Sequence, residues 1–187
     1  AGSARGKPVK SLFSVLSVLC LLTATGCLSP GDSPESRFYQ LTPDPDLRPV
    51  GGRGPGKGVV LHPVRVAEYL ERPEMVRREE RSRVRYLPAH RWAAPLAENA
   101  TDVLFLNLRS MLGDGVRRWP DEGSGEAGVA LDIRLYRLEG VPAGEANLKA
   151  GVRIGDREPE VISLSAPVRG GDVVDVVAAQ SALLSSL

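Results

Sequence analysis

The sequence contains little cysteine, histidine or aromatic side chain. Its 187 residues include two Cys and two His, and the aromatic share is 5%. Two cysteines form at most one disulfide, which excludes a small scaffold held together by several bridges. His62 and His90 lie far apart in the sequence, and with so few thiols they do not supply the four ligands of a structural zinc site. We therefore expect no metal, and the length suits one domain with its own hydrophobic core.

Long hydrophobic runs are also lacking. The most apolar segment, residues 12–22, has about eleven residues, and a helix of that length rises about 16 Å, roughly half the thickness of the hydrocarbon layer. The residues before it include Arg5, Lys7 and Lys10 but no acidic residue, and small residues follow it. This three-part order is typical of a secretory signal peptide, which we assign to residues 1–26.

The end of this segment resembles a bacterial lipobox, with small side chains before a cysteine in the run Leu22-Thr23-Ala24-Thr25-Gly26-Cys27. The resemblance implies cleavage between Gly26 and Cys27 and lipidation of Cys27. Residues 27–37, rich in Ser, Pro and Gly, would then be a lipidated, flexible tether. Leu28 is not the Asp that signals retention in the inner membrane, so we expect an outer-membrane anchor and a periplasmic domain. An ordinary signal peptide with an unmodified cysteine is the alternative.

Loss of the signal peptide would change the net charge. The whole chain has 24 basic and 23 acidic residues, a net charge of +1. Removing the three basic residues of the signal peptide would leave 21 against 23, a net charge of −2. A weakly acidic domain has no general attraction to nucleic acid, so we expect no nucleic-acid partner.

Residues 38–187 have the pattern of a single α+β domain. Apolar and β-branched residues favour strands at residues 37–42, 59–66, 75–76, 84–87, 129–138, 147–154 and 161–168. Pro63 predicts a bend or an edge position in the second of these strands. Apolar residues alternate with polar residues over residues 131–136, which indicates one buried and one wet face.

Two long helices complete this pattern. The first is expected over residues 95–112, with Pro95 at its first position and Gly113 after its end. Asp172 is a suitable cap for the second, over residues 173–187. Both have an apolar side, so we predict a largely antiparallel or mixed sheet with the two helices packed on one face.

Several segments imitate catalytic or cofactor motifs. Residues 51–58 approach a phosphate-binding loop, but Gly58 replaces the hydroxyl that holds magnesium; residues 123–128 spell a dinucleotide pattern but precede a strand. Glu98 and Asp102 share a helix face and could act as an acid–base pair, but we prefer to interpret them as a solvated first turn that the helix dipole favours. A Ser-His-acid arrangement stays open, but no serine elbow is found. We expect no catalytic residue and no cofactor.

An arginine-rich hairpin is the clearest charged feature. Seven arginines and four glutamates lie between Glu71 and Trp92. Guanidinium groups bind phosphate and carboxylate through paired hydrogen bonds, so Arg81, Arg83 and Arg85 are candidate contacts for a partner or an anionic lipid. A salt-bridged hairpin surface is the alternative.

Two further segments resemble the PqiC-type lipoproteins, the auxiliary lipoprotein components of ABC-type transport systems that carry MCE proteins. Residues 64–76 and 90–96 contain the eight motif residues Tyr69, Leu70, Arg72, Pro73, Arg91, Trp92, Pro95 and Leu96. Residues 37–41 and 178–183 also fit the family pattern. Because the two prolines restrict the chain, and Tyr69 and Trp92 offer large apolar surfaces to a core, we expect a structural role for this motif.

The resemblance implies a non-enzymatic outer-membrane lipoprotein of a PqiABC-like system that moves lipids between membranes and supports the envelope barrier. Its partners would be the MCE protein of the same system and the membrane, through the lipid anchor. Phospholipid and homo-oligomerisation are further candidates. The alternatives are a structural or chaperone-like envelope lipoprotein and, in a different class, an anchored hydrolase with a polar cleft.

Overall fold

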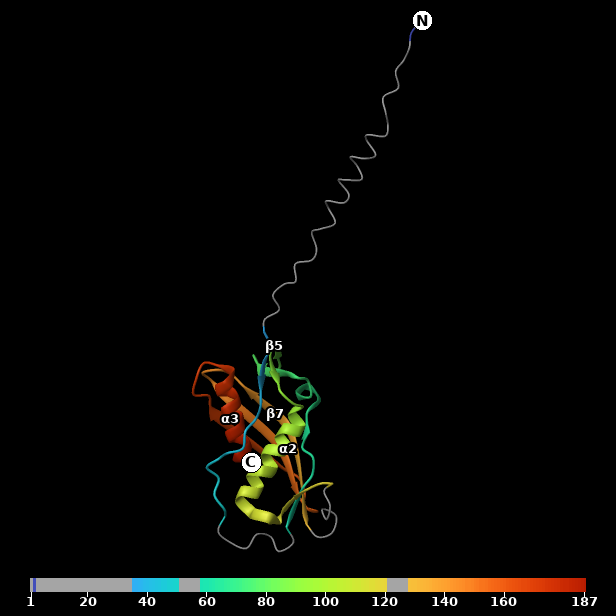
Figure 1. Ribbon diagram of the computed structural model, residues 1–187, viewed down its shortest axis with the longest axis vertical. Helices are drawn as coiled ribbons and strands as arrows, with labels where there is room; N and C mark the ends of the chain where they lie inside the picture. The colour runs from blue at the N-terminus through green and yellow to red at the C-terminus, as the bar shows by residue number, and fades with distance from the viewer. Residues whose placement is uncertain (1, 3–34, 51–57, 121–127) are drawn as a thin grey trace. The chain divides into compact units, whose positions relative to one another are not determined.

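The computed structural model describes residues 2, 35–50, 58–120 and 128–187 (Figure 1). Apart from Gly2, the expected signal peptide lies outside the described residues, as do Cys27 and most of the tether. So do residues 51–57 and 121–127, which include most of the glycine-rich segments 51–58 and 123–128. The folded part is one unit, residues 36–187.

The described strands form two mixed sheets, ordered β1-β5-β4 and β6-β2-β7-β8-β9, with β3 also paired to β7. The strands are β1 (Arg37–Tyr39), β2 (Val59–Leu61), β3 (Arg65–Val66), β4 (Glu74–Arg78), β5 (Val84–Trp92), β6 (Val116–Arg118), β7 (Val129–Gly140), β8 (Glu145–Ile154) and β9 (Glu160–Pro167). Strands β7, β8 and β9 form an antiparallel meander, while β2 and β3 join β7 in parallel. The larger sheet is therefore the mixed form of the predicted sheet.

Two helices, α2 (Leu96–Leu112) and α3 (Val173–Ser185), lie on one side of the larger sheet (Figure 1). This confirms the predicted α+β class. The first helix begins one residue later than expected, because Pro95 occupies the N-cap and not the first helical position. The predicted Asp172 cap is present as a reciprocal capping box with Asp175. No helix among the described residues is long and apolar enough to cross a membrane.

The core lies between these helices and the larger sheet. Leu135, Leu148 and Leu184 are at most 1% exposed. On β7, Ile133 and Leu135 are buried while Arg134 and Tyr136 are exposed, which confirms the predicted alternation. The other face of β7 and β8 is thus left with polar side chains.

The segment that follows β1 lies against the two helices. The predicted strand at residues 37–42 ends at Tyr39, because backbone groups beyond it bind helix side chains. The Leu41 N–H donates to Asn99 Oδ1 at 2.7 Å, the Thr42 N–H to Ser181 Oγ at 3.1 Å, and the Asp44 N–H to Asn107 Oδ1 at 3.0 Å. Buried polar residues on α2 and α3 therefore fasten the chain between the expected lipid tether and the domain.

Two features of the sheets differ from the sequence prediction. The expected strand at residues 59–66 is two strands, β2 and β3, which Pro63 separates. Strand β6 was not predicted, since it has only three residues and two of them are arginines. Such a strand shows no alternation of apolar and polar residues, and its pairing with β2 over Val59–Val116 is a long-range contact.

Candidate functional site

The motif residues form two groups. The first is apolar and buried: Leu70, Trp92 and Leu96 are 3%, 7% and 2% exposed and belong to the main core. The N–H of Trp92 donates to the Pro73 carbonyl at 2.8 Å, which ties the two motif segments together. Pro95 is exposed at the start of α2.

The second group carries charge at the protein surface. The Arg72 guanidinium lies 4.7 Å from the centre of the Tyr86 ring. Arg91 pairs with Glu74 at 3.2 Å across β4 and β5. Both arginines therefore contact neighbouring side chains of the smaller sheet and its connections.

Tyr69 belongs to a buried charge network that the sequence did not reveal. Its hydroxyl donates to Glu139 Oε1 at 2.6 Å, and Arg78 donates from Nε and Nη2 to the two carboxylate oxygens at 2.6 and 2.7 Å. Glu139 is only 2% exposed. Burial raises the pKa of Tyr69, and the hydrogen bond and negative charge of Glu139 raise it further. The network joins the motif to β4 and β7, and its carboxylate is fully engaged.

The arginine-rich hairpin is largely neutralised within itself. Arg85 pairs with Glu79 at 2.8 Å, and Arg83 pairs with Glu79 at 3.1 Å and with Glu80 at 2.8 Å. Arg81 is exposed and makes no ion pair with any residue that the structure describes. Of the three predicted anion contacts, only Arg81 keeps its charge uncompensated.

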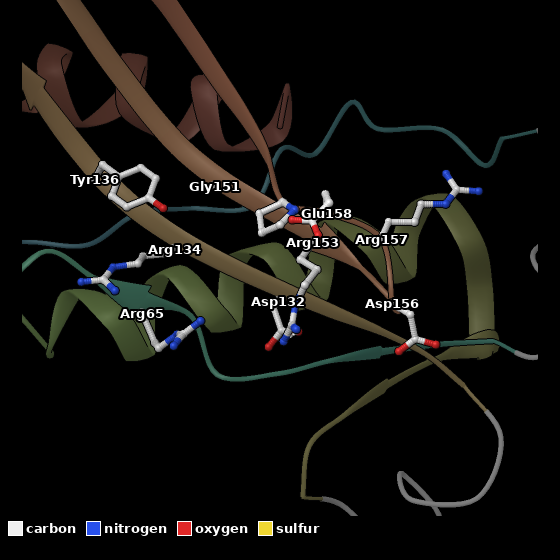
Figure 2. Close-up of a pocket in the computed structure, with 10 residues that line it drawn as sticks. Arg65, Asp132, Arg134, Tyr136, Gly151, Arg153, Asp156, Arg157 and Glu158 are labelled. Carbon is white, nitrogen blue, oxygen red and sulfur yellow. Dashed lines mark hydrogen bonds and ion pairs between the residues drawn. The ribbon is translucent and has the colours of Figure 1, made fainter.

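The exposed face of the larger sheet carries a second group of arginines (Figure 2). Arg65 on β3 and Arg134 on β7 are direct cross-strand neighbours, and both are exposed. Neither forms an ion pair with another described residue. Like charges opposite each other on a sheet repel, so this pair disfavours the folded state unless an anion lies between them.

A nearby carboxylate is already occupied. Asp132 accepts from Arg153 at 2.8 Å and from His62 Nδ1 at 3.0 Å. Burial raises the pKa of Asp132, but hydrogen bonds from His62 and Arg153 and their positive charge outweigh burial and hold it below its usual value. Asp132 is therefore the partner of Arg153 and does not compensate Arg65 or Arg134.

Tyr136 forms one wall beside these arginines. A Cβ at position 151 would lie 2.9 Å from the Tyr136 hydroxyl, so only a glycine there lets the ring lie across β8. The Arg134 guanidinium is 5.8 Å from the centre of this ring. The close-up shows the ring beside Gly151 and the Arg134 and Arg65 side chains near one another (Figure 2).

Together these residues line an open pocket of about 410 Å³. Its lining residues are Arg65, Asp132, Arg134, Tyr136, Gly151, Arg153, Asp156, Arg157, Glu158 and Pro159. Four cations and three carboxylates lie here, and among the cations Arg65 and Arg134 form no ion pair with a described residue. Guanidinium groups next to an aromatic ring suit a phosphate or carboxylate that carries an apolar group.

The other candidate catalytic and metal-binding residues contact neighbouring side chains. Asp102 pairs with Arg118 at 2.9 Å, so its carboxylate serves a salt bridge. His90 Nδ1 lies 2.8 Å from the Tyr39 hydroxyl, and the His62 ring lies 5.6 Å from that of Trp119. In the described ranges, no three His, Cys, Asp or Glu side chains come together as metal ligands.

The family of the chain follows from its sequence. A family model described as "ABC-type transport auxiliary lipoprotein component" matches residues 39–187. This range covers almost all of the folded part and both motif segments. A comparison of the sequence with curated proteins finds no match.

Solved structures share the fold. A crystal structure of an uncharacterised protein is similar with a TM-score of 0.66 and 16% identity, over 82% of this chain and 94% of that one. Protein XCC0632 from Xanthomonas campestris is similar with a TM-score of 0.56 and 18% identity, over 81% of this chain and 89% of its own. At these identities the likeness concerns the fold alone.

Proposed function

Because the chain belongs to the family of ABC-type transport auxiliary lipoprotein components, we propose that it is the non-enzymatic lipoprotein of an MCE-type, PqiABC-like system. Such a system moves lipids between the inner and outer membranes and supports the envelope barrier. The paired motif around Tyr69 and Trp92 supports this assignment. The observation that carries it furthest is the match of the family model to residues 39–187, almost all of the folded part.

The proposed anchor is the lipidated Cys27. Cleavage after Gly26 would leave residues 27–37 as a tether from the outer membrane to the periplasmic domain, residues 38–187. A single acyl chain holds a protein only reversibly, whereas several chains give lasting attachment. Replacing Cys27→Ser should therefore abolish fatty-acid labelling and release the protein from membranes. A variant that still incorporates palmitate at its amino terminus would contradict this part of the proposal.

The proposed contact surface is the pocket beside Arg65 and Arg134. Their uncompensated charges suit either a lipid phosphate or a carboxylate on the MCE partner, both of which bind guanidinium in pairs of hydrogen bonds. The hairpin arginines Arg81, Arg83 and Arg85 remain the contact predicted from sequence. The ion pairs of Arg83 and Arg85 with Glu79 and Glu80 leave only Arg81 unpaired, which makes the hairpin the weaker candidate.

A comparison of two charge-reversal variants separates these surfaces. The variant Arg65→Glu/Arg134→Glu should lose association with the MCE partner or with vesicles of anionic phospholipid, mostly at low salt where screening is weak. The matched variant Arg81→Glu/Arg83→Glu/Arg85→Glu should retain it. Melting temperatures of both variants show whether they fold. If the hairpin variant loses association and the Arg65→Glu/Arg134→Glu variant retains it, the hairpin is the contact surface.

The transport role itself is tested in cells. Deletion of the gene should weaken the barrier to detergents and lipophilic drugs, in a strain that also lacks parallel lipid-transport systems. Complementation with the parent chain should restore the barrier, and complementation with Cys27→Ser should not. A hydrolase activity that depends on one serine or carboxylate would overturn the non-enzymatic assignment.

A further inference from the structure

Strand β9 differs from the other edge strands that the structure describes. An exposed edge offers unpaired backbone groups to another chain, and proteins usually blunt it with short length or with charge. Strands β1, β3, β4 and β6 have three, two, five and three residues, and each carries arginine. Strand β9 has eight residues, and no charged side chain follows Glu160 within it. Among the described strands, β9 is therefore the one long edge strand that is uncharged beyond its first residue.

The outward groups of this edge follow from its pairing with β8. The Val168 N–H donates to the Gly144 carbonyl at 2.8 Å, on the side of β8. In an antiparallel pair, alternate residues point their N–H and C=O to the same neighbour. Val161, Ser163 and Ser165 therefore point theirs away from β8. The backbone nitrogen of Pro167 also points away from β8, so the N–H that proline lacks is not needed for the pairing with β8.

A hollow lies between the edge of β9 and α3. It has a volume of about 340 Å³. Its lining is mostly small and apolar: Ala166, Pro167, Ala178, Ala179 and Ala182, with Arg169 and Asp175 at its rim. Asp175 is occupied by the capping box of α3. A strand added to β9 would thus have an apolar surface available on the helix side.

We propose that β9 pairs in antiparallel fashion with β9 of a second copy of this chain, about a two-fold axis at Leu164. The strand is complementary to itself in this register: Ser163 lies opposite Ser165 of the partner subunit, and each can donate and accept. A two-fold contact uses the same surface twice, so an uncharged, self-complementary strand suits it. The proposal goes beyond the transport role and does not depend on it.

Charge and helix packing favour β9 of a second copy over a strand of an unrelated protein. The register brings Arg169 close to Glu160 of the partner subunit, and neither residue makes an ion pair within the described part of the chain. The axis also places the two α3 helices beside each other. Their exposed Ala178 and Ala182 let the helices approach closely, and Val174, 57% exposed, would be covered at this contact.

Disulfide cross-linking in membranes tests both the contact and its register. Copies of the full-length chain with Ser163→Cys and with Ser165→Cys, carrying different tags, are expressed together and oxidised. Opposed residues of paired strands have Cα atoms near 5 Å apart, within disulfide reach. We expect a mixed-tag dimer from this pair, and none when Ser110→Cys on α2 replaces either partner. A cross-link between two copies that both carry Ser163→Cys would contradict the register. A cross-link to another protein would contradict the proposal that a second copy of this chain pairs with β9.

A backbone variant tests the role of the edge itself. Ser165→Pro removes an N–H that points away from β8, so the fold should persist while the dimer loses two hydrogen bonds by symmetry. The dissociation constant in sedimentation should rise about 10- to 100-fold. If Ser165→Pro unfolds the domain, Ser163→Lys/Ser165→Lys replaces it, since opposed lysines repel. A parent chain that is monomeric in membranes and in detergent, or variants that dimerise unchanged, would refute the proposal.

Discussion

The Arg78 guanidinium holds the buried Glu139 carboxylate through two hydrogen bonds of 2.6 and 2.7 Å, and so joins β4 of the smaller sheet to β7 of the larger one. Such a pair satisfies two charges at once, but it leaves a costly group behind if one partner is lost. The contact between the sheets therefore depends on both residues being present.

The first prediction concerns this pair. Arg78→Ala leaves the Glu139 carboxylate buried without its cation, and the free energy of unfolding should fall by about 3 to 5 kcal/mol. Urea denaturation measures the loss. Arg81→Ala on the same hairpin should change stability by less than about 0.5 kcal/mol, because Arg81 is exposed and unpaired in the described part. Equal effects of the two substitutions would contradict the assigned role.

A double variant sharpens the test. Arg78→Met/Glu139→Gln removes both charges and keeps an acceptor for the Tyr69 hydroxyl. It should recover much of the stability that Arg78→Ala loses, since a neutral pair of similar volume replaces the ion pair. No recovery would indicate that packing of the Arg78 stem, and not its charge, holds the sheets together.

The second prediction concerns alkaline pH. Burial and Glu139 raise the pKa of Tyr69 above that of an unfolded tyrosine, near 10. The neutral phenol is therefore favoured in the fold. Its contribution to stability is complete below pH of about 10 and is lost as the pH rises towards the folded pKa. In an absorbance titration, the component that Tyr69→Phe removes should appear only as the domain unfolds. Ionisation of Tyr69 with the circular dichroism unchanged would contradict this.

The sequence predicts the individual helices and strands better than the contacts between them. Asp172, the alternation on β7 and the helix stop at Gly113 act over a few residues, so their signals are visible in the chain. Alternation from Ile133 and Leu135 would place Glu139 on the face towards the helices. A bulge between Leu135 and Arg137 moves it to the opposite face, where it meets Tyr69 and Arg78. Its partner Arg78 lies 61 residues away. Such a pairing leaves no trace in a single sequence.

The candidate site shows the same limit. The sequence identified three guanidinium groups in the hairpin, but glutamates of the same turn neutralise two of them, Arg83 and Arg85. Arg65 and Arg134 are separated by almost seventy residues and become neighbours only when β3 pairs with β7. Their lack of an ion pair becomes visible only when the structure shows that Asp132 is already bound by Arg153 and His62.

The third prediction concerns acid. Burial raises the pKa of Asp132, but His62 and Arg153 lower it by more, so the pKa in the folded state lies below the usual value. The contribution of this carboxylate to stability is present above the unfolded pKa of about 3.9 and is lost as the pH falls through the folded pKa. Asp132→Asn should therefore reduce the free energy of unfolding at neutral pH and much less at the acid end. Arg153→Met should weaken the same pH dependence, and a pH-independent difference would contradict it.

The fourth prediction separates core from contact surface. Trp92 is 7% exposed in the core, whereas Trp119 is 44% exposed beside His62. Trp92→Ala should lower the free energy of unfolding by about 3 to 5 kcal/mol, because a large cavity replaces the indole. Trp119→Ala, the matched exposed tryptophan, should cost much less. Binding of the proposed MCE partner, measured well below the melting temperature, should survive Trp92→Ala. A variant that melts within a degree or two of the parent but no longer binds would make Trp92 a contact residue, and the motif would then be functional and not structural.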